Sequence, residues 1–232
     1  MAFTLGPAQP RNLLLNWRGV LSIVATLIAA VWALGLLQDI LNVISGAGAD
    51  DRISIFDPDS EEGVLTWISI VLLFVVAGLL FGNGQDAMQT GRGAVLPWFG
   101  LSALFGIVSF DEFYGLHERL SDVLFRNIGG SGLFHFAWVV PLGFLALVGL
   151  WLLMPFLTSL GPRTRRLAVM SAAVYLTGAV GMEMFAGPVI EELGRHTFQY
   201  RLLTNLEEGL EVAGILLFIY TLQQYREAPG RA

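Results

Sequence analysis

Two acidic clusters inside apolar stretches are the groups best suited to chemistry in this chain. The first lies in Ser109–Glu118, with the sequence SFDEFYGLHE, and the second is Glu207–Glu211, with EEGLE. A further acid, Glu183, stands between methionines in an apolar segment. Ionisable side chains in membrane segments are costly unless a cation, a proton or a water-filled cavity compensates them. The pattern therefore predicts a functional site that holds a positive species.

Helical spacing indicates which of these groups could share a site. At about 100° per residue, Asp111 and Glu118 fall on one stripe with Tyr114 at its edge, and His117 lies on its flank. On the later helix, Glu208 and Glu211 are three residues apart and lie on one face. The predicted metal ligands are Asp111, His117, Glu118, Glu208 and Glu211.

The donor types limit the metal and suggest the catalytic groups. Carboxylates with one or two imidazoles suit Zn, Fe or Mn, and an all-oxygen set suits Mg or Ca. Glu183, with no basic residue within a helical turn, is the predicted acid–base group, and Tyr114 is the second candidate catalytic residue. The expected cofactor is thus a divalent metal.

Other polar residues have simpler structural interpretations. Glu112 and Arg119 are expected to form a local ion pair or to contact lipid headgroups, and Thr204-Asn205-Leu206-Glu207 matches a capping box at a helix start. His135 lies between two phenylalanines, which is typical of an interfacial side chain. His196 follows Glu192 by four residues, a spacing that favours a solvated pair.

Composition places the chain in a membrane. Of its 232 residues, 55% are hydrophobic and 14% charged, and the mean hydropathy is +0.66. The absence of cysteine excludes disulfides and thiolate metal sites, and the absence of lysine excludes Schiff-base chemistry. A net charge of −6 offers no basic stripe for a phosphate backbone, so no nucleic-acid partner is expected. Membrane lipids are the expected partners.

The hydrophobic pattern predicts an all-α, single-domain transmembrane bundle over 1–232. A spanning helix needs about 20 mostly apolar residues. Six segments approach this length, and a short interfacial helix is expected near 188–198. The six lie near 19–44, 64–82, 95–125, 134–158, 166–187 and 204–224.

The arginines indicate the orientation of the bundle. With six spans, eight arginines lie on the side of the two termini and five on the other, so both termini are expected to be cytoplasmic. All the intramembrane acids and the three histidines then lie in the outer leaflet. Ala47-Gly48-Ala49 resembles a signal cleavage site, but the apolar segment before it is long enough to be a retained anchor.

Two family resemblances accompany this interpretation. The motifs SFDE…HE and EEGLE resemble those of an uncharacterised family of small polytopic bacterial membrane proteins, which implies location in the bacterial inner (plasma) membrane but no activity. The chain is also distantly similar to the seven-helix metal-dependent membrane hydrolases that include alkaline ceramidases and adiponectin-receptor-like proteins. The similarity is limited to His and Asp at one end of a bundle, and the paired histidines of their last helix are replaced here by Glu208 and Glu211.

Three functions fit these features. The leading hypothesis is a metal-dependent membrane enzyme, a hydrolase or oxidase, acting on a lipid-like substrate at the outer leaflet. The second is a cation or proton transporter that uses Glu183 as part of a relay. The third is a non-catalytic accessory subunit whose acids pair with a partner or bind structural ions.

Overall fold

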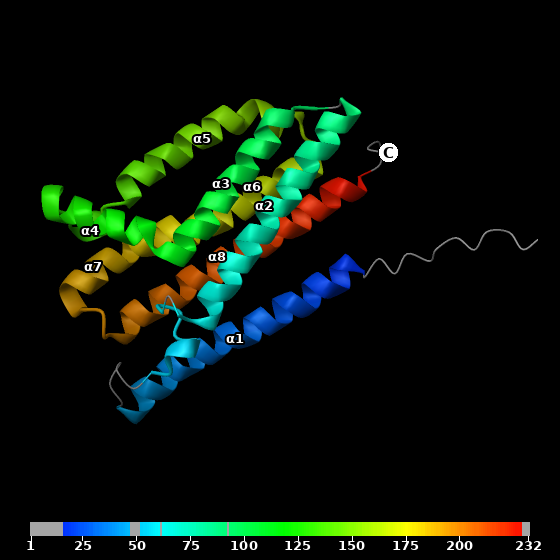
Figure 1. Cartoon of the computed structure of the whole chain (residues 1–232). Helices are drawn as coiled ribbons and strands as arrows, with labels where there is room; N and C mark the ends of the chain where they lie inside the picture. The colour runs from blue at the N-terminus through cyan, green and yellow to red at the C-terminus, as the bar shows by residue number, and fades with distance from the viewer. Residues whose placement is uncertain (1–15, 47–51, 61, 92, 229–232) are drawn as a thin grey trace, which may run out of the picture.

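The computed structural model describes residues 16–46, 52–60, 62–91 and 93–228, and its regular elements there are all helical (Figure 1). The first half contains α1 (Trp17–Ser45), α2 (Val64–Thr90), α3 (Val95–Tyr114) and α4 (Leu116–Ile128). The second half contains α5 (Val139–Ser159), α6 (Pro162–Leu176), a π-helical segment (Thr177–Met182), α7 (Glu183–Leu193) and α8 (Phe198–Glu227). Short 3-10 turns lie at Ser54–Phe56 and Gly132–Phe134.

Five of the helical stretches are long and apolar enough to cross a membrane, which indicates a multi-pass membrane protein. They are α1, α2, α3, α5 and the continuous stretch Pro162–Leu193 formed by α6, the π segment and α7. Helix α8 has 30 residues but is not among the five. The three glutamates in Glu207–Glu211 lower its hydropathy. The expected cleavage motif at Ala47–Ala49 lies outside the described residues.

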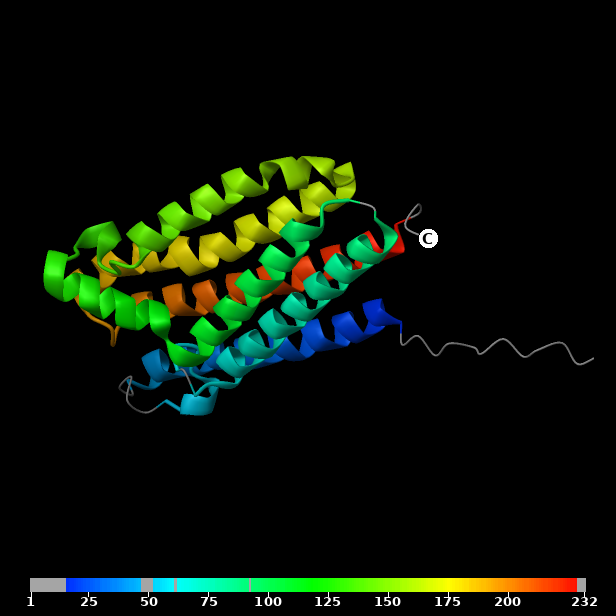
Figure 2. The ribbon, with the colours of Figure 1, turned by 45° about the horizontal axis from the view of Figure 1, so that its top comes forward.

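The helices form an elongated bundle with α1 and α5 on opposite sides (Figures 1 and 2). In both views α2 and α8 lie between these two helices. The start of α1 and the end of α8 lie at one end of the bundle, while α4, α7 and the start of α8 lie at the other (Figure 1). We call the latter the α4 end.

The third predicted helix is interrupted. Residues near 95–125 were expected to form one helix, but α3 ends at Tyr114 and α4 begins at Leu116. Gly115 between them has φ of 59°, a left-handed conformation that glycine adopts without steric cost. Helix α4 therefore leaves the direction of α3, and it alternates apolar and charged faces as a helix at a membrane surface does.

The fifth predicted helix instead extends further than expected. Residues 188–193 are the last turns of α7, and only residues 194–197 separate that helix from α8, so the separate interfacial helix expected near 188–198 is not formed. Pro188 was expected to start a new helix, but α7 already begins at Glu183, five residues before it. Gly187 lies directly against the backbone of Gly132, which holds α7 in this position.

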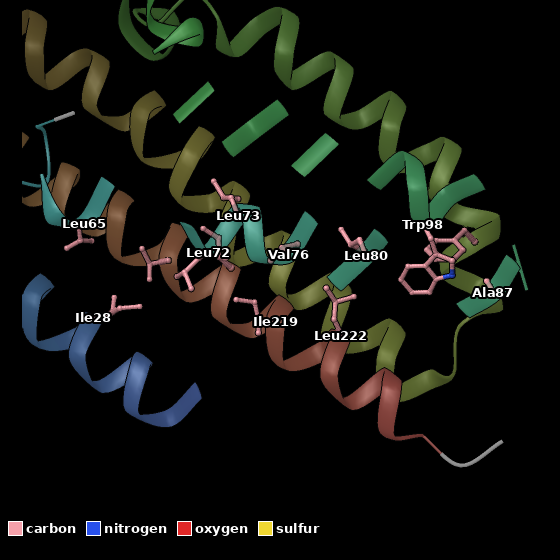
Figure 3. Packing of buried hydrophobic residues seen from close by; sticks show 13 residues of the cluster. Ile28, Leu65, Leu72, Leu73, Val76, Leu80, Ala87, Trp98, Ile219 and Leu222 are labelled. Atoms are coloured by element: carbon pink, nitrogen blue, oxygen red, sulfur yellow. The ribbon is translucent and has the colours of Figure 1, made fainter. Parts of the chain in front are cut away.

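A buried apolar cluster fills the middle of the bundle and the half away from α4 (Figure 3). Side chains from α2 and α8 dominate it, including Leu73, Val76, Leu80 and Ile219. Because lipid tails are as apolar as these side chains, close packing and interhelical hydrogen bonds hold such helices together. Ser102 and Ser109 of α3 donate to carbonyls of α2 at 2.8 and 2.9 Å.

Candidate functional site

The junction of α3 and α4 organises the first part of the site. Asp111 Oδ1 accepts a hydrogen bond from the backbone N–H of His117 at 2.9 Å, and Oδ2 lies 2.9 Å from the Nδ1 of the same residue. Both carboxylate oxygens are thus used to hold the first turn of α4. The predicted ligands Asp111 and His117 are therefore in contact, but as a hydrogen-bonded pair with each other.

His117 serves as a positive charge in this arrangement. Burial alone would lower the pKa of its imidazole, but the hydrogen bond and charge of Asp111, with smaller contributions from Glu183 and Glu118, raise that pKa to about 9. The ring therefore favours its protonated form at neutral pH, and metal binding would require it to lose that proton. Its ring also packs edge-on against Trp138, with centroids 5.2 Å apart.

Glu183 lies next to this junction at the start of α7. Its side chain is only 8% exposed, and it interacts electrostatically with both His117 and Glu118. Its Oε2 atom has no hydrogen-bond partner among the described residues. A buried carboxyl oxygen in this condition must be satisfied by a proton, water or a cation.

Helix α8 contributes the second part of the site. Glu211 is 8% exposed, and the Oε2 of Glu208 is buried without a hydrogen-bond partner in the described part of the chain. Glu112 of α3 is within electrostatic range of both glutamates, and Glu183 is within range of Glu211. Acids from three separate helices thus lie near one another.

Two of the groups at this cluster were not identified from the sequence. Glu112 was considered only in a local pair with Arg119 or at lipid headgroups, and it is also within electrostatic range of the α8 acids. Tyr175 of α6 is also within electrostatic range of Glu211, Glu112 and Glu208. The sequence signal for Tyr175 was the set of small residues that follow it, because small side chains let α6 and α8 approach closely.

The π-helical segment brings the α6–α7 stretch against the acidic part of α8. A Cβ atom placed on Gly178 would lie 2.8 Å from the carbonyl oxygen of Glu207 and 3.0 Å from Cγ of Glu211. Only glycine therefore fits this contact. Single π turns within α-helices are frequent at functional sites. The irregular backbone here lies directly beside the carboxylates.

The predicted ligand set does not assemble as one coordination sphere. Among the described residues, no three His, Asp or Glu side chains are placed closely enough together to hold a metal ion. Asp111 and His117 form one pair at the α3–α4 junction, and Glu208 and Glu211 lie on α8. Metal binding would require the carboxylates to draw together around the ion.

Three other features considered from the sequence are not part of the carboxylate cluster. Tyr114 is 45% exposed, and the guanidinium of Arg119 lies 4.9 Å from its ring centre. His135 contacts Glu191 Oε1 at 3.1 Å. The capping box expected at 204–207 is not a helix start, because α8 begins six residues earlier, where the Thr197 hydroxyl accepts from the backbone N–H of Tyr200.

A second buried polar cluster, also missed from the sequence, lies at the same end. Arg52 pairs with Asp39 and Asp57, and Arg201 lies 3.0 Å from Asp59. The side chains of Arg52 and Asp39 are only 5% and 3% exposed. We call these five residues the arginine network. Asn205 Nδ2 joins it by donating to Asp39 at 2.7 Å.

Comparison with known proteins places the chain in a family without assigning it an activity. A family model described as a domain of unknown function, DUF8692, matches residues 20–224, and the chain belongs to that family. No curated protein and no solved structure matches it. The expected membership of an uncharacterised family is consistent with this result. The likeness to metal-dependent membrane hydrolases receives no support from it.

Proposed function

We propose that this chain binds a divalent cation among the carboxylates of α3, α7 and α8 and uses it to act on a lipid-like substrate from the outer leaflet. One observation carries the proposal. Two buried carboxylate oxygens from different helices, Oε2 of Glu183 and Oε2 of Glu208, lack a hydrogen-bond partner among the described residues. Such oxygens are costly to bury unless a positive species satisfies them.

The proposed membrane arrangement has six spans, with α8 as the sixth. At 1.5 Å per residue, a helix of this length is about 45 Å long, enough to cross a bilayer. Figure 1 shows that α8 runs along the whole bundle. The start of α1, the start of α6 and the end of α8 lie towards the end opposite α4 (Figure 1). These helix ends contain Arg18, Arg163 and Arg226, which supports a cytoplasmic location for both termini in a bacterial inner membrane.

The charge balance favours a cation at the α8 acids. Glu112, Glu208 and Glu211 interact electrostatically with one another, and like charges at short range cannot all remain ionised without a positive partner. Glu208 and Glu211 are one turn apart, so one ion could contact both. Since His117 is protonated, the available donors are oxygens, which suit Mn, Mg or Ca better than Zn.

The protein groups have distinct roles in the proposed site. A bound cation would polarise a substrate oxygen or promote ionisation of a water molecule. Glu183 would accept or donate a proton at Oε2. His117 would hold a positive charge beside Glu183 and favour its ionised form. The α4 end lies where lipid headgroups meet the bundle, so a lipid-like substrate could reach the acids without leaving the membrane.

A proton-binding function is the second candidate. It is favoured by the lack of a ready three-ligand group among the described residues, since protons could neutralise the same acids. A complete relay through the bilayer has less support. The half of the bundle away from α4 holds apolar side chains such as Leu80, Ile219 and Leu222 (Figure 3). Its buried Asn83 and Thr221 have no ionisable group.

Metal content of the purified protein tests the proposal. Wild-type protein loaded with Mn²⁺ and then dialysed is expected to retain close to one equivalent, and the Glu183→Gln/Glu208→Gln double variant is expected to retain almost none. Glu192→Gln is the matched control, because Glu192 is an exposed acid on α7. Equal, near-zero metal in all three proteins would exclude the cation site. In that case, proton flux in proteoliposomes that Glu183→Gln abolishes would favour the second candidate.

The enzymatic part of the proposal requires its own measurement. Metal-loaded wild-type protein is incubated with a bacterial lipid extract, and new lipid products are sought by mass spectrometry. We expect products with the wild type and the Glu192→Gln control but not with the double variant. Stabilisation by metal without any product would instead favour an accessory subunit that binds a structural ion.

A further inference from the structure

A small polar cavity lies apart from the carboxylate cluster. It is bordered by the end of α1, the segment that begins at residue 52, and the start of α8. Its volume is about 60 Å³. Two guanidinium groups line it, those of Arg52 and Arg201, together with Asn42 and His196. The cavity is thus bordered by hydrogen-bond donors from three separate elements.

The carboxylates around the cavity are already engaged. Asp39 binds Arg52 through one oxygen and accepts from Asn205 through the other at 2.7 Å. Asp59 accepts from the Tyr200 hydroxyl at 3.1 Å and from Arg201 Nη1 at 3.0 Å. These acids orient the guanidinium groups, but some N–H donors of the lining residues remain without an acceptor.

Apart from Arg52 Nη2, which is ion-paired with Asp39, two donors of the lining residues have no partner among the described residues. They are Nδ2 of Asn42 and Nε of Arg201, and both atoms are buried. A buried donor without an acceptor costs about 1–3 kcal/mol, so the cavity calls for a ligand rich in acceptors. The volume exceeds what a single water molecule needs, so the cavity has room for a tetrahedral oxyanion.

We propose that this cavity binds a phosphate-type oxyanion, with Asn42 Nδ2 and Arg201 Nε donating to its oxygens. Guanidinium groups match the geometry of phosphate oxygens and are weakly hydrated, which suits them to this role. The inference is independent of the cation site proposed above, because the two clusters share none of their residues.

The surroundings of the cavity show how its charge could be accommodated. Three carboxylates of the arginine network face two guanidiniums, but burial raises the pKa of Asp59, opposed by the charge of Arg201. Neutralisation of Asp59 would leave the network with equal numbers of positive and negative charges. A singly charged phosphodiester could then bind without repulsion from an excess of acids.

The position also suits the headgroup of a phospholipid. Asn42 and Val43 belong to the last turns of α1, where Leu41 and Ile44 are exposed, Ile44 at 76%. Apolar side chains exposed at the end of a membrane span contact acyl chains near the headgroup region. A phosphodiester in the cavity could therefore be attached to chains lying along α1. A free phosphate ion offers the same chemistry.

Thermal unfolding in a phosphate-free sugar detergent tests the proposal. The probes are inorganic phosphate, a phosphatidylglycerol, and a diacylglycerol with the same acyl chains but no phosphate. We expect phosphate or phosphatidylglycerol, but not diacylglycerol, to raise the melting temperature of the wild type. A response to inorganic phosphate identifies a free anion as sufficient, and a response to phosphatidylglycerol alone identifies a lipid headgroup.

The Asn42→Asp variant provides the matched comparison, since it keeps the side-chain shape but adds a negative charge. We expect it to lose the response, whereas Asn127→Asp, the same change at an exposed position on α4, keeps it. Asn42→Leu removes the donor without adding charge and is expected to weaken binding at least about tenfold, which decides the matter if Asn42→Asp fails to fold. No response to either phosphate probe, or equal responses in wild type and the Asn42 variants, would overturn the proposal.

Discussion

The two polar clusters at the α4 end differ in how their charges are compensated. In the arginine network, each of the carboxylates Asp39, Asp57 and Asp59 has a guanidinium partner. In the cluster of Glu183, Glu208 and Glu211, the structure shows no arginine ion pair for any of the three within the described residues, and two of their oxygens lack hydrogen-bond partners. The carboxylates of the first cluster are thus neutralised by arginines, whereas the buried oxygens of the second have no such partners.

This difference separates a structural role from a functional one. The ion pairs tie the segment between α1 and α2 to α1 through Arg52 and to α8 through Arg201, and so fix the α4 end of the bundle. Uncompensated buried carboxylates give no such benefit and are retained in membrane segments mainly for function. Substitutions in the two clusters should therefore have opposite effects on stability and on cation binding.

The largest effect is expected from breaking the arginine network. Replacing Arg52 by Gln leaves Asp39 buried without its cation, and removal of one partner of a buried pair typically costs about 3–5 kcal/mol. The free energy of unfolding in detergent, measured by denaturant titration, should fall by that amount. Arg163→Gln, at an exposed position, is the control and should change it by less than about 0.5 kcal/mol.

The His117–Asp111 pair should make stability depend on pH. The folded pKa of His117 is about 9, above the ordinary value of 6.5, so its stabilising effect is fully present below pH 6.5 and is lost as pH rises to about 9. The loss amounts to at most about 3 kcal/mol. Melting temperature measured from pH 6 to 9.5 should fall in the wild type and stay flatter in His117→Gln.

His196→Gln, at an exposed histidine, serves as the control for that series and should follow the wild type. A wild-type profile that remains flat across this range would mean that His117 is not held as an imidazolium. The role given to it beside Glu183 would then be wrong.

The close contact at the π segment should be sensitive to a single methyl group. Gly178→Ala would force the added carbon against the backbone of α8 near Glu207 and Glu211, at a cost of about 1–3 kcal/mol. Gly181→Ala in the same segment meets only an ordinary contact, at 3.7 Å from Thr177 Cγ2, and should be nearly neutral. Thermal unfolding of the two variants compares these positions directly. Equal decreases in melting temperature would argue against close packing at Gly178.

The smallest effect on stability is expected at Glu208, whose Oε2 has no hydrogen-bond partner among the described residues. Glu208→Gln in cation-free buffer should leave the free energy of unfolding unchanged or raise it by up to about 1 kcal/mol, because a neutral amide is less costly to bury than a carboxylate. Denaturant titration of Glu208→Gln and Arg52→Gln side by side compares the free energies of unfolding of the two variants. A loss as large as that of Arg52→Gln would show that Glu208 already has an internal partner.

The helical membrane character and most of the acids could be predicted from the sequence, but the partners of those acids could not. Hydrophobic runs locate the spans because each apolar stretch must cover the bilayer thickness. The break at Gly115 was missed, since helix spacing was extended across a glycine that in fact turns the chain. That error carries over to the site, because it placed Asp111 and Glu118 on one helical stripe, whereas the turn at Gly115 separates them.

The arginine network shows a different limit of the sequence. Asp39, Arg52 and Arg201 are up to 162 residues apart, and no local pattern indicates that they meet. Their contacts depend on how α1 and α8 pack, which is encoded by small residues and shape. Trp32 Nε1, for example, donates to the carbonyl of Asn205 at 2.7 Å, beside Gly209, where α1 approaches α8 closely.

Isothermal titration of Mn²⁺ into the purified protein, in two buffers with different ionisation enthalpies, measures directly whether the carboxylate cluster binds a cation. We expect binding to the wild type with release of protons, since the carboxyl groups bind the ion only when ionised, and loss of that binding in Glu208→Gln/Glu211→Gln. Binding should persist in Asn42→Leu, which alters only the other cavity. No heat of binding in the wild type, or equal binding in the double variant, would mean that these carboxylates do not form a cation site.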